Sequence, residues 1–362
     1  EKLKLLGFVV SHNSVSVDPS LVESMKNFAW QDLDMRPLCL VPGLALLAWP
    51  LVDRSSTWLT LTLAGLAMGI IIFIMASGLT WVFGLMDVLN FGHGLFIAVG
   101  AFVATTVLGA MTDWTSTPDW GLNLAAIALA MLAAMTLAAI LGWAFERVIV
   151  RPVYGQHLKQ ILITMGGMIM GEELIKVIWG PLQMALPLPE ALRGVFYWGD
   201  AALEKYRLLA VGVGLLVVTA QMWVLTRTKV GLLVRAGVHD REMVEALGYR
   251  ISHLFVGVFV VGSVLAALGG VMWGLYQQNV TPQIGAQVNV LIFIVIIMGG
   301  LGSTGGALIG ALLVEKTKNP LAGLWYVIAV ALMTFLVGTF GLTESHRTEI
   351  WREAEEARPA TA

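Results

Sequence analysis

Long apolar segments separated by short polar stretches occupy most of this chain. A helix needs roughly 20 apolar residues to cross the hydrocarbon core of a bilayer. Residues 288–300 and 307–314 are apolar but too short to span, so we interpret them as half-helices. The pattern predicts an all-α integral membrane protein with about 8–9 transmembrane helices and broken or re-entrant half-helices. The predicted spans are 58–86, 91–111, 122–145, 161–179, 208–225, 253–276, 321–342 and, more weakly, 38–52.

The same pattern divides the chain into three parts. Residues 1–37 mix charged and apolar positions, which predicts an amphipathic or partly ordered N-terminal segment without a cleavable signal peptide. Residues 38–343 form the transmembrane domain, which includes a polar loop over 226–250. Residues 344–362 form a charged C-terminal tail, which we expect to be solvated.

Loop charges orient the predicted bundle, because cytoplasmic loops carry an excess of lysine and arginine. The loops over 146–160 and 226–250 are basic, whereas 112–121 holds no basic residue and contains Asp113 and Asp119. Two spans separate the basic loops, as a shared side requires. We therefore predict that both basic loops are cytoplasmic and that 112–121 and 181–207 are external.

Composition agrees with lipid as the solvent. Hydrophobic residues make up 57% of the 362 residues and charged residues 13%, with a mean hydropathy of +0.80. Soluble domains are usually about 25% charged. The net charge of −2 offers no argument for nucleic-acid binding. Cys39 is the single cysteine, so the chain cannot form an intrachain disulfide.

One glycine-rich polar break falls between two strong spans and consists of Asn90, Gly92, His93 and Gly94 with Phe91. Irregular backbone at membrane depth survives only where protein covers it or where it lines a water-filled cavity. A functional interpretation places this break on a transport path. The alternative is a tight turn whose glycines relieve crowding, with Asn90 capping the next helix.

A second break separates the two half-length segments and contains Gly299, Gly300, Gly302, Ser303 and Thr304. Broken helices of this kind often line membrane transport sites, although small residues also let helices approach closely. No lysine follows these glycines, and no phosphate-binding P-loop occurs anywhere in the chain. We therefore expect no ATPase site and no enzyme activity in this chain, and no metal site is indicated.

The basic loop over 226–250 contains a short amphipathic stretch that Asp240 can cap and Gly248 can end. Such a helix between two spans suits docking to a soluble partner, and an ordinary interfacial helix is the alternative. Its residues are Asp240, Arg241, Met243, Val244, Glu245, Ala246, Leu247 and Gly248.

Charges also occur inside the predicted span over 161–179, at Glu172, Glu173 and Lys176. Glu173 and Lys176 are three residues apart and can pair on a helix. Charged residues within spans are functional candidates by default. The alternative is a structural, partly hydrated pair near the outer end of the helix, which ends at Gly180 and Pro181.

Three segments together resemble the permease family of branched-chain amino acid ABC importers: residues 84–94 with 100–102, the loop over 226–250, and residues 298–307. The resemblance implies a type II-like importer permease whose 240–248 segment is the coupling helix. It also implies a second permease subunit, homologous or identical, two ATPase subunits that hold ATP and Mg, and an external solute-binding protein. This chain itself would bind no cofactor and would lie in a bacterial-type inner membrane as a multi-pass protein.

The resemblance does not fix the solute, because relatives of this family also carry urea, short amides and other small compounds. A stand-alone secondary transporter or channel is the alternative, with the two breaks as its site and Glu172, Glu173 and Lys176 as its coupling charges. A membrane-embedded enzyme is disfavoured, because no convergent acid–base or metal set occurs.

Overall fold

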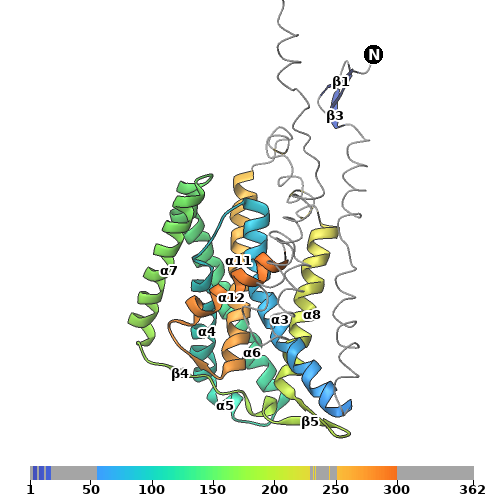
Figure 1. Cartoon of the computed structure of the whole chain (residues 1–362), viewed down its shortest axis with the longest axis vertical. Coiled ribbons are helices and arrows are strands. Elements are labelled where there is room, and N and C mark those ends of the chain that lie inside the picture. The colour runs from blue at the N-terminus through green and yellow to red at the C-terminus, as the bar shows by residue number, and fades with distance from the viewer. Residues whose placement is uncertain are drawn as a thin grey trace, which may run out of the picture.

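The computed structural model describes residues 55–228 and 251–299, three strands within 3–17, and the single residues 231, 233 and 244. The long helices among these residues pack into a bundle (Figure 1). They are α3 (Ser55–Met86), α4 (His93–Ala110), α6 (Trp120–Phe145), α7 (His157–Trp179), α8 (Lys205–Arg227), α11 (Ile251–Gln277) and α12 (Ile284–Gly299).

Five helices of the described residues are long and apolar enough to cross a membrane. They cover Ser55–Gly84, His93–Ala110, Trp120–Val153, Lys205–Arg227 and Ser252–Gln277. The predicted spans over 58–86, 91–111, 122–145, 208–225 and 253–276 are thus confirmed as helices within a few residues. The predicted spans 38–52 and 321–342 and the half-helix 307–314 lie outside the described residues, and the total helix count stays a prediction.

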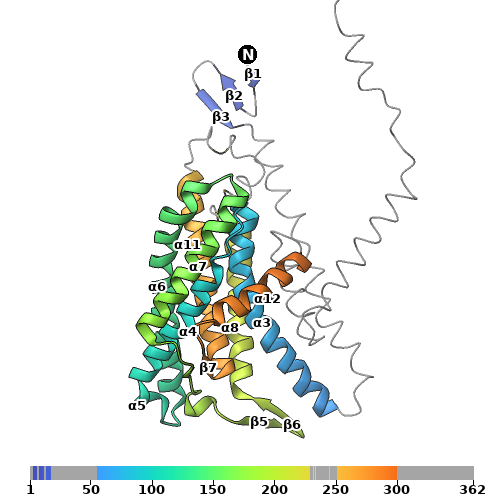
Figure 2. The ribbon, with the colours of Figure 1, turned by 60° about the vertical axis from the view of Figure 1, so that its left-hand side comes forward.

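The helices α7 and α12 differ from the other long helices. The helix α7 coincides with the predicted span 161–179, but Lys159, Glu172, Glu173 and Lys176 make it more polar than the spans. The helix α12 is apolar and has 16 residues, which fits the predicted half-helix over 288–300. It lies obliquely across the bundle rather than along it (Figure 2).

Short strands, which the helical pattern did not predict, occur outside the bundle helices. Near the N-terminus β1 (Leu3–Leu5), β2 (Phe8–Ser11) and β3 (Ser14–Val17) form an antiparallel sheet. The strands β5 (Val195–Trp198) and β6 (Ala201–Glu204) form a hairpin whose turn holds Gly199 at φ 60°. The strand β4 (Met184–Ala185) pairs with β7 (Asn279–Val280). The all-α prediction therefore holds for the bundle and misses these strands.

The helix α11 lies at the centre of the bundle, where it packs against α3, α4 and α6. Small residues let these helices approach closely. A Cβ added at Gly100 of α4 would overlap the backbone of Ala267, and one added at Gly270 would overlap the carbonyl of Ile97. Gly78 of α3 faces Gly262 of α11 in the same way.

The connections between helices gather at two opposite ends of the bundle (Figure 1). One end holds the α6–α7 connection, which includes a π-helix over Glu146–Val150 and a 3-10 turn over Arg151–Val153. The end of α8 lies on that side as well. The opposite end holds α5 (Thr112–Thr115), β4 and the β5–β6 hairpin. The basic residues before α7 (Arg147 and Arg151) and the one that ends α8 (Arg227) thus lie at the same end of the bundle, as the loop charges predict.

Candidate functional site at the break between α3 and α4

Irregular backbone separates α3 from α4 over residues 87–92. The chain leaves α3 at Asp87, which adopts φ 54°, a left-handed conformation that is uncommon for residues other than glycine. The helix α4 then begins at His93 with Gly92 as its N-cap, and no side chain caps it. The part of the alternative in which Asn90 caps α4 is therefore wrong, whereas Gly92 and Gly94 do lie in crowded contacts, as the alternative expected. The side chain of Asn90 is instead buried, with 1% of the residue exposed.

Side chains from two other helices satisfy the free backbone groups of Phe91 in this break. The Phe91 N–H donates to Thr164 Oγ1 of α7 over 3.1 Å. The Phe91 carbonyl accepts a hydrogen bond of 2.9 Å from Asn289 Nδ2 of α12. The Phe91 ring stacks on Phe293 of α12 with 4.4 Å between ring centroids. The break is thus covered by protein on both sides, which is the condition under which non-helical backbone persists at membrane depth.

His93 ties the start of α4 to the middle of α3. Its Nε2 lies 2.9 Å from the carbonyl oxygen of Met75, and 1% of the residue is exposed. The carbonyl accepts, so Nε2 is the protonated nitrogen in this arrangement. Gly92 packs under the ring of Phe145, where a Cβ would clash. These two predicted site residues therefore lie in helix contacts rather than on an open surface.

Buried carboxamides around the break keep polar atoms without partners. Asn90 Oδ1, Asn289 Oδ1 and both side-chain atoms of Gln160 have no hydrogen-bond partner, and all three residues are at most 5% exposed. Gln160 lies one turn before Thr164, whose hydroxyl bonds the Gln160 carbonyl over 2.6 Å. Unpaired buried polar atoms are costly, so each calls for an explanation. Sequence reasoning missed Asn289, Gln160 and Thr164, because single polar residues in apolar segments carry no spacing signal.

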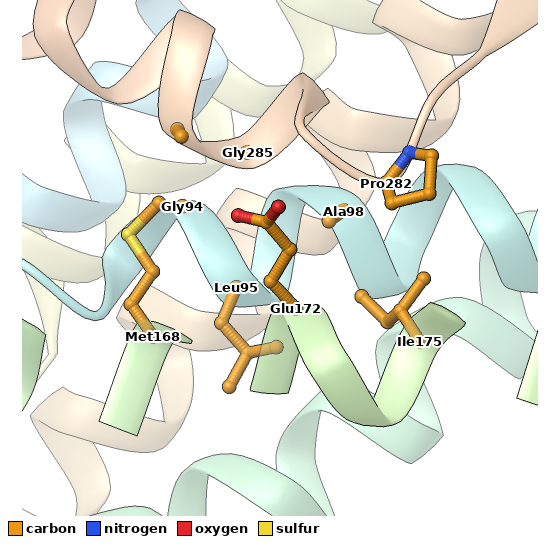
Figure 3. Close-up of a pocket in the computed structure, with 9 residues that line it drawn as sticks. Gly94, Leu95, Ala98, Met168, Glu172, Ile175, Pro282 and Gly285 are labelled. Atoms are coloured by element: carbon orange, nitrogen blue, oxygen red, sulfur yellow. The ribbon is translucent and has the colours of Figure 1, made fainter. Parts of the chain in front are cut away.

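A small groove opens beside the break, between α4, α7 and α12. Gly94 and Gly285 line it, and a Cβ on either one would overlap the other's carbonyl. The side chain of Glu172 reaches from α7 toward α4 and α12 (Figure 3). The remaining lining residues are apolar: Leu95, Ala98, Met168, Ile175, Pro282 and Ala286.

The charges of α7 form one cluster, as their spacing predicted. Lys176 Nζ lies 2.7 Å from a carboxylate oxygen of Glu173 and 3.0 Å from one of Glu172. The side chains of Glu172 and Lys176 are 20% and 24% exposed, whereas that of Glu173 is 63% exposed. Glu172 is therefore the acidic member that faces the protein, and the predicted pairing of Glu173 with Lys176 is confirmed.

A second buried polar pair, which the sequence did not reveal, lies in the α6–α7 connection. Tyr154 donates a hydrogen bond of 2.5 Å to Glu146 Oε1, and the other oxygen of this buried carboxylate has no partner. Burial, followed by the hydrogen bond to Glu146, raises the pKa of Tyr154 above its ordinary value. The Tyr154 ring also meets Phe255, four residues into α11, edge-on at 5.9 Å.

The remaining predicted site residues lie outside the described part of the chain. Of the second break, Gly299 ends α12, and Gly300, Gly302, Ser303 and Thr304 are not described. Of the loop over 226–250, Val244 is buried. Its neighbours Asp240, Arg241, Met243, Glu245, Ala246, Leu247 and Gly248 lie outside the described residues. No cluster suited to a metal ion occurs among the described residues.

Known proteins resemble this chain over most of its length. The LivH permease of the high-affinity branched-chain amino acid transport system of Escherichia coli is 28% identical over 255 residues, covering 69% of this chain and 81% of LivH. The corresponding BraD permease of Pseudomonas aeruginosa is 29% identical over 262 residues, with the same two shares. A probable branched-chain amino acid permease of Methanocaldococcus jannaschii, LivM, is 23% identical over 265 residues, which is 66% of this chain and 75% of LivM.

The family model described as "Branched-chain amino acid transport system / permease component" matches residues 61–339. This range includes every long helix of the described bundle, apart from the first turns of α3. No solved structure matches the chain. The chain therefore belongs to the permease family of the branched-chain amino acid ABC transporters.

Proposed function

We propose that this chain is the membrane-spanning permease subunit of an ABC importer for branched-chain or other small amino acids and related small polar solutes. The observation that carries the proposal is the break at residues 87–92, which neighbouring helices cover within a bundle of membrane-length helices. This connection between α3 and α4 is buried and held by side chains of α7 and α12, which favours a position beside a path for a polar solute. The family match over 61–339 supports the solute class.

In this proposal the solute path follows the break and the groove beside it. Asn90, His93 and Gly94 contribute from the α3–α4 side, and the glycine-rich second break follows α12. Apart from the Glu172 carboxylate, the groove is lined by apolar side chains and backbone. Such a path suits zwitterionic or neutral solutes better than ions, because a net charge would lack a partner.

The driving force comes from partners in this proposal. Two ATPase subunits hold ATP and Mg, contact the segment 240–248 from the cytosol and move the bundle through it. An external solute-binding protein delivers the solute, and a second permease, homologous or identical, completes the membrane unit in a bacterial-type inner membrane. Both LivH and LivM relatives in one organism are named as permease proteins, which supports a paired arrangement.

Co-expression with the ATPase, second permease and solute-binding protein of the transporter, followed by reconstitution of the purified complex in proteoliposomes, tests the proposal. We expect ATPase subunits to co-purify with the chain. Uptake of a labelled panel of leucine, valine, alanine and urea should require both ATP and the binding protein. Full-rate transport by the purified chain alone, without nucleotide, would contradict the importer and favour a stand-alone transporter.

Variants of the proposed coupling segment give a sharper test. Glu245→Ala and Gly248→Val should retain assembly with the ATPase subunits but lose uptake, since ATP hydrolysis would no longer move the bundle. Gly212→Val is a matched control, because Gly212 of α8 has open space around its Cα. Normal uptake by both coupling variants would show that the segment 240–248 does not transmit the movement.

A further inference from the structure

The helix α12 contacts the break at three successive turns of one face. Gly285 lies against Gly94, Asn289 bonds the Phe91 carbonyl, and Phe293 stacks on the Phe91 ring. These residues are four apart, which places them in one row along the helix. The row runs along α4 from the groove to the break. The position of α12 against the break is therefore fixed by specific contacts, namely a close glycine approach, a hydrogen bond and a ring stack.

The other backbone group of Phe91 is held by α7. Thr164 accepts from the Phe91 N–H, so a residue that belongs to no helix is held between α7 and α12. Each holding bond is a single neutral hydrogen bond. Such bonds contribute little net free energy when water or solute can replace them. The two hydrogen bonds therefore position Phe91 specifically, but water or solute can replace either bond at little cost in free energy.

Two side-chain oxygens without hydrogen-bond partners show where a solute or water molecule could bind. Asn289 uses its amide hydrogen toward Phe91 and leaves Oδ1 unpaired, and Asn90 Oδ1 is unpaired on the residue before Phe91. Both oxygens are buried acceptors. A solute with an ammonium or amide N–H, or a water molecule, would satisfy them, whereas the packed state leaves them without donors.

We propose that Asn289 is a positioning residue that keeps the path closed, and that α12 is the gate element that moves away from Phe91 when the solute passes. This inference rests on the proposed transport function and assigns to it residues outside both glycine-rich breaks. Withdrawal of α12 breaks the bond to Phe91 and its ring stack. It also separates Gly285 from Gly94 and so opens the groove toward the break.

The test uses the assembled transporter in proteoliposomes without ATP. The probe is whichever labelled panel solute the wild-type complex takes up fastest with ATP. Asn289→Ala removes the donor to Phe91, and Thr164→Val removes the acceptor while keeping the side-chain shape. Asn289→Ala should raise ATP-independent efflux of the probe about fivefold, the change in a closed-to-open equilibrium expected for one neutral hydrogen bond. Thr164→Val should raise efflux less, because the bond from Phe91 to α7 is not broken when α12 withdraws.

Asn123→Ala is the matched control. Asn123 is also a buried asparagine, and its Nδ2 donates to the carbonyls of Trp114, Thr117 and Asp119 near α5, away from the break. Thermal unfolding of the three variants in detergent provides the second measurement. Asn123→Ala should lower stability at least as much as Asn289→Ala and leave efflux unchanged, because it removes more bonds outside the path.

The outcomes separate this inference from the proposed function. A wild-type complex without ATP-dependent uptake would overturn both. A transporting wild type whose Asn289→Ala variant loses stability without added efflux would assign Asn289 a structural role only. Efflux that rises equally in Asn123→Ala would also overturn the gate, since any loosening of the bundle would then suffice.

Discussion

Among the described residues, the buried Glu146 carboxylate accepts a hydrogen bond from the Tyr154 hydroxyl at one oxygen, and its other oxygen has no partner. We predict that Tyr154→Phe destabilises the protein by about 1–3 kcal/mol, because a buried acceptor then lacks its donor. The raised pKa of Tyr154 means that this contribution is complete below pH 10 and is lost only as pH rises through the higher folded-state value. Thermal unfolding in detergent measures it, and Thr136→Val, at an exposed hydroxyl of α6, should be neutral.

Single residues also show where sequence reasoning ends. Glycine and histidine at positions 90–94 attract attention by composition, and the structure does place Gly94 at the groove. Asn289 and Thr164 are isolated polar residues in apolar runs, so their function depends on which residues the fold brings opposite them. A single sequence carries no such pairing, and the contact to Phe91 spans 198 positions in the chain.

At the scale of whole helices, the α4–α11 contact depends on the absence of a side chain at Gly100. We predict that Gly100→Ala costs about 1–3 kcal/mol, because its methyl would push α4 away from Ala267. Gly109→Ala in the same helix has open space and should be neutral or slightly stabilising. Yield and thermal stability of the complex compare the two variants, and equal losses would contradict the contact.

The charge cluster of α7 is a second property of a whole helix. Lys176→Met leaves Glu172 without its cation beside the groove, and we expect several-fold lower yield of folded complex. The double variant Glu172→Gln with Lys176→Met removes both charges and should recover most of that yield. Failure of the double variant to recover would show that Lys176 acts through something other than the pair.

Helix positions were predictable because lipid imposes one length and one polarity on each span, so α3, α4, α6, α8 and α11 follow the apolar segments closely. The short strands were not predictable in this way. The two-residue strands β4 and β7 pair between segments nearly a hundred positions apart. The β5–β6 hairpin carries an aromatic strand and a Gly199 turn, a signal that a search for spans overlooks.

For the whole molecule, the arrangement of loops makes a prediction about sidedness. The α6–α7 connection, which contains exposed Gln156, lies at the end of the bundle opposite α5, which exposed Ser116 follows. In a background with Cys39→Ser, an impermeant thiol reagent added outside the cell should label Ser116→Cys and leave Gln156→Cys unmodified until the membrane is opened. The reverse pattern would invert the topology and place the 226–250 loop outside.

The ribbon between β4 and β7 has a mechanical consequence for the whole molecule. It fastens the chain after α7 to the turn that leads into α12, only a few residues before Gly285. A displacement of β4 would therefore move β7 and the start of α12 directly, without passing through the other helices of the bundle. A partner that binds at this end of the molecule would therefore contact a segment that is only a few residues from the helix that covers Phe91.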